Sequence, residues 1–120
     1  MRVLVLDDEI SILEMITDML EPEGFDVITA PDGNKGMQIV ECTPDIDIVI
    51  TDMMMPEKEG LETVIELKTH YPSIKILAIS GGGINQPEAY LDIARKMGAD
   101  ATLCKPFIKK QLLDCLQEIV

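Results

Sequence analysis

Short apolar runs alternate with longer amphipathic stretches along the whole chain, and this alternation most constrains its fold. The run Val3–Leu6 contains no polar residue and ends abruptly in Asp7 and Asp8. Such a run is typical of a strand covered on both faces, as in a parallel sheet. Residues 10–20 then place apolar side chains at helical spacing. The opening of the chain therefore predicts a buried strand followed by an amphipathic helix.

The pattern of a strand followed by a helix occurs five times along the chain. Strands are expected at 3–6, 25–30, 47–51, 74–79 and 101–104, with a helix after each. The helices should turn these apolar residues inward: Ile12, Leu13, Ile16, Met19, Leu20, Met37, Val40, Leu61, Val64, Ile65, Leu67, Tyr90, Ile93, Ala94, Met97, Leu112, Leu113, Leu116 and Ile119. Right-handed crossovers favour a doubly wound, flavodoxin-like α/β fold with a five-stranded parallel sheet of order 2-1-3-4-5 and five helices. We expect one domain, residues 1–120.

Composition excludes several classes of function. The formal net charge is −12, which repels phosphate backbones, so we expect no direct nucleic-acid binding. No apolar stretch is long enough to cross a bilayer, and the acids after Leu6 interrupt any leader-like run. The three cysteines, Cys42, Cys104 and Cys115, lack metal-site spacing. They are interpreted as reduced core thiols of a cytoplasmic protein.

Polar residues stand where four of the predicted strands end. Asp7 and Asp8 follow the first strand, Asp52 the third, Ser80 the fourth and Lys105 the fifth. In this topology ligands bind beyond the carboxyl ends of the strands. The first and third strands are neighbours, so three carboxylates should converge. Two carboxylates about 5 Å apart repel by about 3 kcal/mol, so either one acid is protonated or a cation lies among them.

The chemistry of this cluster points to phosphoryl transfer. Oxygen ligands in a site with few protein groups suit Mg²⁺. A metal ion, an ammonium group and a hydroxyl around one carboxylate make an environment for a bound phosphoryl group. Asp52 is the central acid, and carboxylates can form acyl phosphates, so Asp52 is the expected nucleophile.

Four segments in order resemble the receiver domain of two-component response regulators. They are VLVLDDE, DIVITDMMMPEKEG, KILAISGG and GADATLCKPF, and they span the chain. The resemblance implies a domain that takes a phosphoryl group onto Asp52 and changes conformation. It also implies Mg²⁺ coordination by Asp7, Asp8, Asp52 and the backbone carbonyl of Met54. Ser80 would bind a phosphoryl oxygen, and Lys105, before a cis bond to Pro106, would pair with it.

Four positions depart from the family or bear on its chemistry. Thr102 replaces the usual aromatic residue of the switch, and Ala101 replaces an acid used for pairing in some dimers. Met54 and Gly82 would border the path of an attacking water. The Met54 side chain is apolar and Gly82 has none, so neither residue can orient the water. A long-lived phosphoryl group is therefore expected.

The resemblance also implies partners and leaves alternatives. A sensor histidine kinase or phosphotransfer protein would donate the phosphoryl group, and an output domain or downstream protein would receive the signal. We expect a monomer or weak dimer, with no enzymatic activity beyond its own phosphorylation and dephosphorylation. The alternatives are a Mg²⁺-dependent phosphatase with an aspartate nucleophile and a docking domain that is never phosphorylated. Met54 stands where such a phosphatase needs a second aspartate, and the intact acids argue against a mere docking role.

Overall fold

The computed structural model describes residues 1–53, 60–80 and 87–120, with the backbone alone at 87–91. The strands are β1 (Arg2–Leu6), β2 (Asp26–Ala30), β3 (Ile48–Asp52), β4 (Lys75–Ser80) and β5 (Ala101–Cys104). The helices are α1 (Ile10–Leu20), α2 (Gly33–Cys42), α3 (Gly60–His70), α4 (Pro87–Met97) and α5 (Lys109–Ile119), with a 3₁₀ turn at Glu21–Glu23. All strand pairs are parallel and the order is β2-β1-β3-β4-β5, which confirms the predicted fold.

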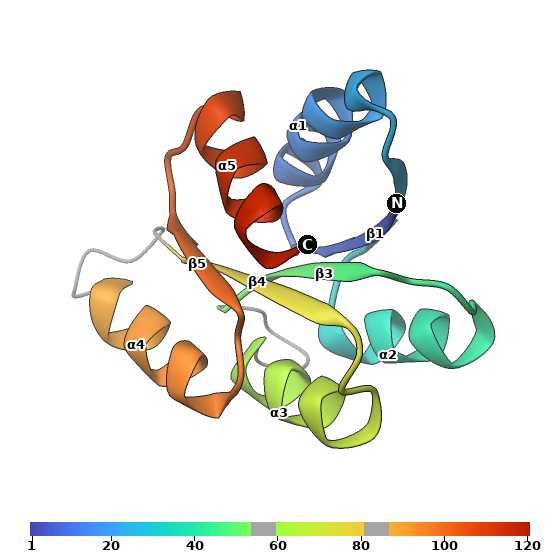
Figure 1. Cartoon of the computed structure of the whole chain (residues 1–120), viewed down its shortest axis with the longest axis vertical. Helices are drawn as coiled ribbons and strands as arrows, with labels where there is room; N and C mark the ends of the chain where they lie inside the picture. The colour runs from blue at the N-terminus through green and yellow to red at the C-terminus, as the bar shows by residue number, and fades with distance from the viewer. Residues whose placement is uncertain (54–59, 81–86) are drawn as a thin grey trace.

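The sheet is covered on both faces, as its apolar strands predict. Helices α1 and α5 lie on one face and α2, α3 and α4 on the other (Figure 1). Each face has its own buried cluster, and successive strand residues alternate between them. Val3 and Val5 face α1 and α5, whereas Leu4 and Leu6 face the opposite layer. The central strands β1, β3 and β4 are therefore buried on both faces, which explains their largely apolar sequence, whereas the edge strand β2 has exposed Asp26 and Thr29.

Local signals set the ends of several elements. Asp32 precedes α2, and its carboxylate accepts a hydrogen bond from the Lys35 backbone N–H at 2.8 Å, which satisfies a free donor of the first turn. Gly24 and Gly98 have φ values of +91° and +123°, which side chains disfavour, and they follow the 3₁₀ turn and α4.

Three apolar residues assigned to the core are exposed instead. Ile65 on α3 is 43% exposed, and Ile93 and Met97 on α4 are 41% and 46% exposed. Ile65 lies about 100° round the helix from buried Val64, so it points away from the sheet. On α4, Ala94 is fully buried and makes the contact with the core. The predicted apolar stripes were therefore wider than the contact that each helix makes. Tyr90 lies outside the described side chains.

The cysteines are free, but the assignment to the core was wrong for two of them. Cys42 and Cys104, the last residues of α2 and β5, are exposed, whereas Cys115 is half-buried and packs against the core cluster that α1 and α5 cover. Among the helices in the described part of the chain, none combines the length and apolar character needed to span a membrane.

Candidate functional site

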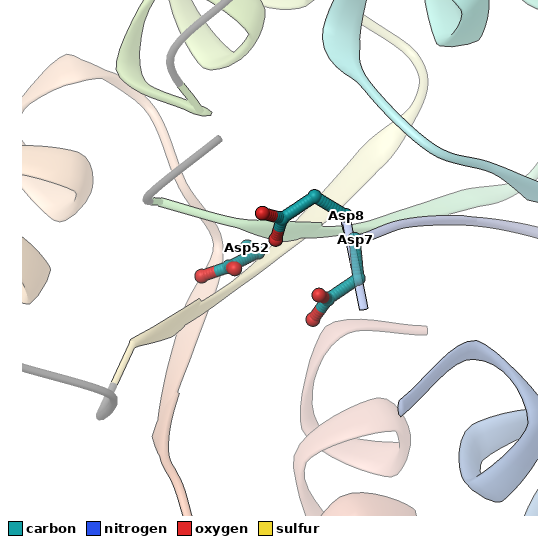
Figure 2. Close-up of side chains that lie close together, drawn as sticks. All are labelled: Asp7, Asp8 and Asp52. Carbon is teal, nitrogen blue, oxygen red and sulfur yellow. The ribbon is translucent and has the colours of Figure 1, made fainter. Parts of the chain in front are cut away.

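Three carboxylates meet where β1 and β3 end. Asp7 and Asp8 follow β1, and Asp52 is the last residue of β3. One oxygen from each lies within 4.8 Å of the others, and the side chains project into one region (Figure 2). Asp7 and Asp52 are buried, with 2% and 6% exposure, whereas Asp8 is exposed. The predicted convergence of acids is therefore present, with two of them largely removed from water.

Lys105 supplies a positive charge to this cluster from the end of β5. Its Nζ lies 2.9 Å from Oδ2 of Asp7 and 3.5 Å from Oδ2 of Asp52. The lysine side chain is 14% exposed. The amine donates a hydrogen bond to Asp7, so the closer contact is with the β1 acid and not with Asp52. Lys105 thus bridges the two buried carboxylates.

The electrostatics of Lys105 balance two opposing effects. Burial lowers the pKa of its ammonium group. The hydrogen bond to Asp7 and the negative charges of Asp52, Asp7 and Glu9 outweigh burial, so the pKa is raised above the ordinary 10.5. Lys105 is therefore fully protonated near neutral pH and remains a hydrogen-bond donor.

Asp7 is held on both sides of its carboxylate. Oδ2 accepts from Lys105, and Oδ1 accepts from the backbone N–H of Glu9 at 2.9 Å. Its own backbone N–H donates to the carbonyl of Ala30 in β2 at 3.2 Å. Asp8 does not cap α1, because Glu9 occupies the N-cap position. The site therefore contains one tightly bound acid, Asp7, and one exposed acid, Asp8.

Ser80 and Lys105 are brought to the same edge by the strand register. Asp52 pairs with Ile79, so Ser80 stands one residue beyond the acid's partner on β4. The backbone N–H of Lys105 donates to the Ser80 carbonyl at 2.8 Å. Ser80 is 2% exposed. The bond from Lys105 to Pro106 is cis, as the resemblance implied.

The donor set of this cluster fits a hard divalent cation. Three carboxylates and one ammonium group leave two net negative charges among the described residues of the site. Carboxylate oxygens are the ligands that Mg²⁺ prefers, and exposed Asp8 leaves the group open to water molecules. Lys105 neutralises only part of the charge, so a cation among the acids would be stabilised. Met54, whose backbone carbonyl is the predicted metal ligand, lies outside the described residues. So does Gly82, which was predicted, like Met54, to be unable to orient an attacking water.

One contact near the site was not foreseen from the sequence. Thr102, in the place of the usual aromatic, receives a 2.6 Å hydrogen bond on its hydroxyl from the guanidinium group of Arg95. The bond links α4 to β5. Little in the sequence indicated this bond, because Arg95 and Thr102 lie on different elements and their spacing of seven residues predicts no contact.

Comparison with known proteins gives one family. The model of the "Response regulator receiver domain" matches residues 3–117. The chain is 30% identical over 120 residues to the transcriptional regulatory protein CpxR of Escherichia coli, covering 99% of this chain and 49% of that protein. The chain thus spans about half the length of the curated relatives it matches.

Solved structures show the same likeness. A response regulator receiver domain protein from Clostridium thermocellum has a TM-score of 0.84 and 35% identity, over 97% of this chain and 90% of that one. The chemotaxis protein CheY4 of Vibrio cholerae has a TM-score of 0.87 and 31% identity, over 99% and 98%.

Proposed function

The chain belongs to the response regulator receiver family, and from that premise we propose that Asp52 is its phosphoacceptor, in a reaction that depends on Mg²⁺. One observation carries the proposal. Asp52 is a nearly buried carboxylate, 3.5 Å from the ammonium group of Lys105, within a cluster of three acids. A carboxylate in such a place costs free energy unless a cation or hydrogen bonds offset its charge.

The residues of the site divide the chemistry between them. An oxygen of Asp52 forms a bond to phosphorus while the bond from phosphorus to the donor breaks, and the donor keeps the electron pair. A carboxylate nucleophile has no proton to lose in this step, so no base is needed. Lys105 offsets negative charge on the phosphoryl oxygens, and the hydroxyl of Ser80 would donate to one of them.

Asp7 and Asp8 would hold Mg²⁺ together with Asp52 and the backbone carbonyl of Met54. When bound, Mg²⁺ supplies positive charge that draws the phosphoryl oxygens to the site. Asp7 also has a second role, because its hydrogen bond to Lys105 directs the ammonium group toward Asp52. The exposed acid, Asp8, would serve only to bind the metal.

The proposed domain spans residues 1–120 and exchanges signals with other proteins. A histidine kinase or phosphotransfer protein would supply the phosphoryl group, as receiver domains require. An output domain or a separate downstream protein would receive the signal; CpxR is about twice as long as the matched segment, whereas CheY4 is matched over 98% of its length, so both arrangements occur among the matched proteins. We place this chemistry in the cytoplasm, with the chain a monomer or weak dimer. We expect no turnover of other substrates.

Incubation of the chain with Mg²⁺ and acetyl phosphate tests the proposal. We expect one added phosphoryl group on Asp52 by mass spectrometry, lost on chelating Mg²⁺ beforehand. Asp52→Asn should take up none, whereas the matched control Asp18→Asn, an exposed acid on α1, should behave as wild type. Turnover of phosphate esters would indicate the phosphatase alternative. An unmodified wild-type chain would indicate a docking domain.

A further inference from the structure

The peptide group that joins Asp52 to Met53 is held at both of its polar ends. The backbone N–H of Met53 donates to the carbonyl of Ile79 on β4 at 2.9 Å. The hydroxyl of Thr51 donates to the carbonyl of Asp52 at 3.0 Å. A peptide group is planar, so fixing both ends fixes its orientation. This is the first peptide beyond the carboxylate proposed to react.

The bond from Thr51 stands where pairing with β1 ends. The ladder between β1 and β3 stops at the pair Leu6 and Thr51, whereas the ladder between β3 and β4 continues to Asp52 and Ile79. The Asp52 carbonyl therefore lies beyond the ladder with β1. The side chain of Thr51 supplies a donor for it.

Helix α3 closes a third side of the same peptide. A Cβ atom on Gly60 would collide with the carbonyl oxygen of Asp52 and would lie 2.6 Å from Cα of Met53. These are backbone atoms, which cannot turn aside as a flexible side chain can. The absence of a side chain at Gly60 thus lets the first residue of α3 abut the acceptor's own backbone.

Packing alone does not explain a hydroxyl at position 51. Thr51 is fully buried, and strand alternation places it on the same face as Val49, in the apolar layer that also contains Val64 of α3. Valine has nearly the same shape and carries no polar group that must be satisfied. The hydroxyl in this apolar layer is therefore accounted for by its bond to the Asp52 carbonyl.

We propose that Thr51 is a positioning residue for phosphoryl transfer: its hydroxyl, with Ile79 and Gly60, fixes the peptide after Asp52 and so directs the Asp52 carboxylate toward Lys105. The inference rests on the proposed function of Asp52. Rotation of this peptide would alter the torsion at the Asp52 α-carbon and displace the carboxylate. Reacting groups must be held within about 0.5 Å, and a misplacement of about 1 Å can cost about a hundredfold in rate.

Two pairs of proteins isolate the effect of the hydroxyl. Wild type and Thr51→Val have side chains of nearly the same shape, and only wild type has the hydroxyl. Thr51→Ser and Thr51→Ala likewise differ by the hydroxyl. Each variant is phosphorylated with Mg²⁺ and acetyl phosphate, and the initial rate is read by mass spectrometry beside a thermal melt. Thr51→Val should react about tenfold more slowly than wild type while melting close to it. Thr51→Ser should react at a rate close to that of wild type, and Thr51→Ala should react more slowly than Thr51→Ser.

The control removes a hydroxyl at the far end of the molecule. Thr69 lies one residue before the end of α3, and its hydroxyl donates to the Ile65 carbonyl at 2.8 Å. Thr69→Val should react at the wild-type rate.

The outcomes separate this inference from the function on which it rests. Equal rates within both pairs, with wild type phosphorylated, would overturn the role of Thr51 and leave that of Asp52 intact. If Thr51→Val fails to fold, the pair Thr51→Ser and Thr51→Ala decides by the same criterion. A wild-type chain that takes up no phosphoryl group refutes both proposals.

Discussion

Replacing Lys105 with methionine removes a cation from between two buried carboxylates. Its Nζ lies 2.9 Å from Asp7 and 3.5 Å from Asp52, and these acids are 2% and 6% exposed. Methionine keeps most of the apolar stem, so the change is chiefly one of charge. Lys105→Met leaves the two acids facing each other without their bridging ammonium group.

The structure sets the size of the effect. At an effective dielectric constant of about 20, the attraction is about 6 kcal/mol for the Asp7 contact and about 5 kcal/mol for the Asp52 contact. Desolvation of the ions offsets much of this, and removing one partner of a buried pair typically costs about 3–5 kcal/mol. The 14% exposure of Lys105 favours about 3 kcal/mol. An unfolding entropy of about 0.25 kcal/mol/K for a chain of this length turns that into a Tm lower by about 12 °C.

Thermal melts in EDTA at neutral pH measure the effect. The matched control is Lys109→Met, because Lys109 pairs with Glu23 at 3.0 Å while both side chains are 42% exposed. An exposed pair contributes less than about 1 kcal/mol, so this control should melt within about 4 °C of wild type. Adding Mg²⁺ should raise the Tm of Lys105→Met by more than that of wild type, since acids that have lost the ammonium group attract a cation more strongly.

A single result would refute this reasoning. If Lys105→Met melts as close to wild type as Lys109→Met does, the contacts to Asp7 and Asp52 contribute no more than a surface ion pair. The two acids would then be stabilised by other groups, and Lys105 would be free to serve only the phosphoryl group.

Three further predictions follow from the same contacts. Asp8→Ala should abolish Mg²⁺-dependent phosphorylation while leaving the Tm in EDTA unchanged or slightly higher, because Asp8 is exposed and its loss relieves repulsion; a clear loss of stability with Mg²⁺ binding retained would contradict this. The raised pKa of Lys105 means that its stabilisation is present below 10.5 and is lost as pH rises through the higher folded-state pKa. The stability difference between wild type and Lys105→Met should therefore be constant from pH 7 to pH 10 in denaturant titrations, and a decline within that range would count against it. Burial, with the charges of Glu118 and Asp114, raises the pKa of the Cys115 thiol above 9.0, so iodoacetamide should label it at pH 8 more slowly than a free cysteine derivative, a result that equal rates would exclude.

Much of the fold could be predicted from the sequence because strand and helix patterns are local. The unbroken run Val3–Leu6 requires cover on both faces, and the structure confirms a sheet enclosed by two helical layers. The extent of each helix's contact could not be predicted. Ile93 and Met97 have the spacing of core residues, yet their exposure depends on how closely α4 approaches the sheet.

The composition of the site was also accessible from the sequence. Parallel strands end at one edge, so Asp7, Asp52, Ser80 and Lys105 had to gather there once the topology was assigned. Lys105 was predicted near the acids, but its shorter contact to Asp7 than to Asp52 was not. That preference depends on side-chain direction, which the strand pattern does not encode.

The sequence by itself determined which residues stand at the ends of the strands. An apolar run and the polar residue that ends it lie within a few positions of each other, so the pattern is visible in a short stretch of sequence. Tertiary structure alone decided which of those groups touch. Lys105 and Asp7 are 98 positions apart and meet through the register of four strands. The abutment of Gly60 on the Asp52 carbonyl likewise requires α3 to return to the end of β3. Contacts of this kind depend on the packed positions of whole elements, and a shift of one ångström would change them without altering the pattern in the sequence.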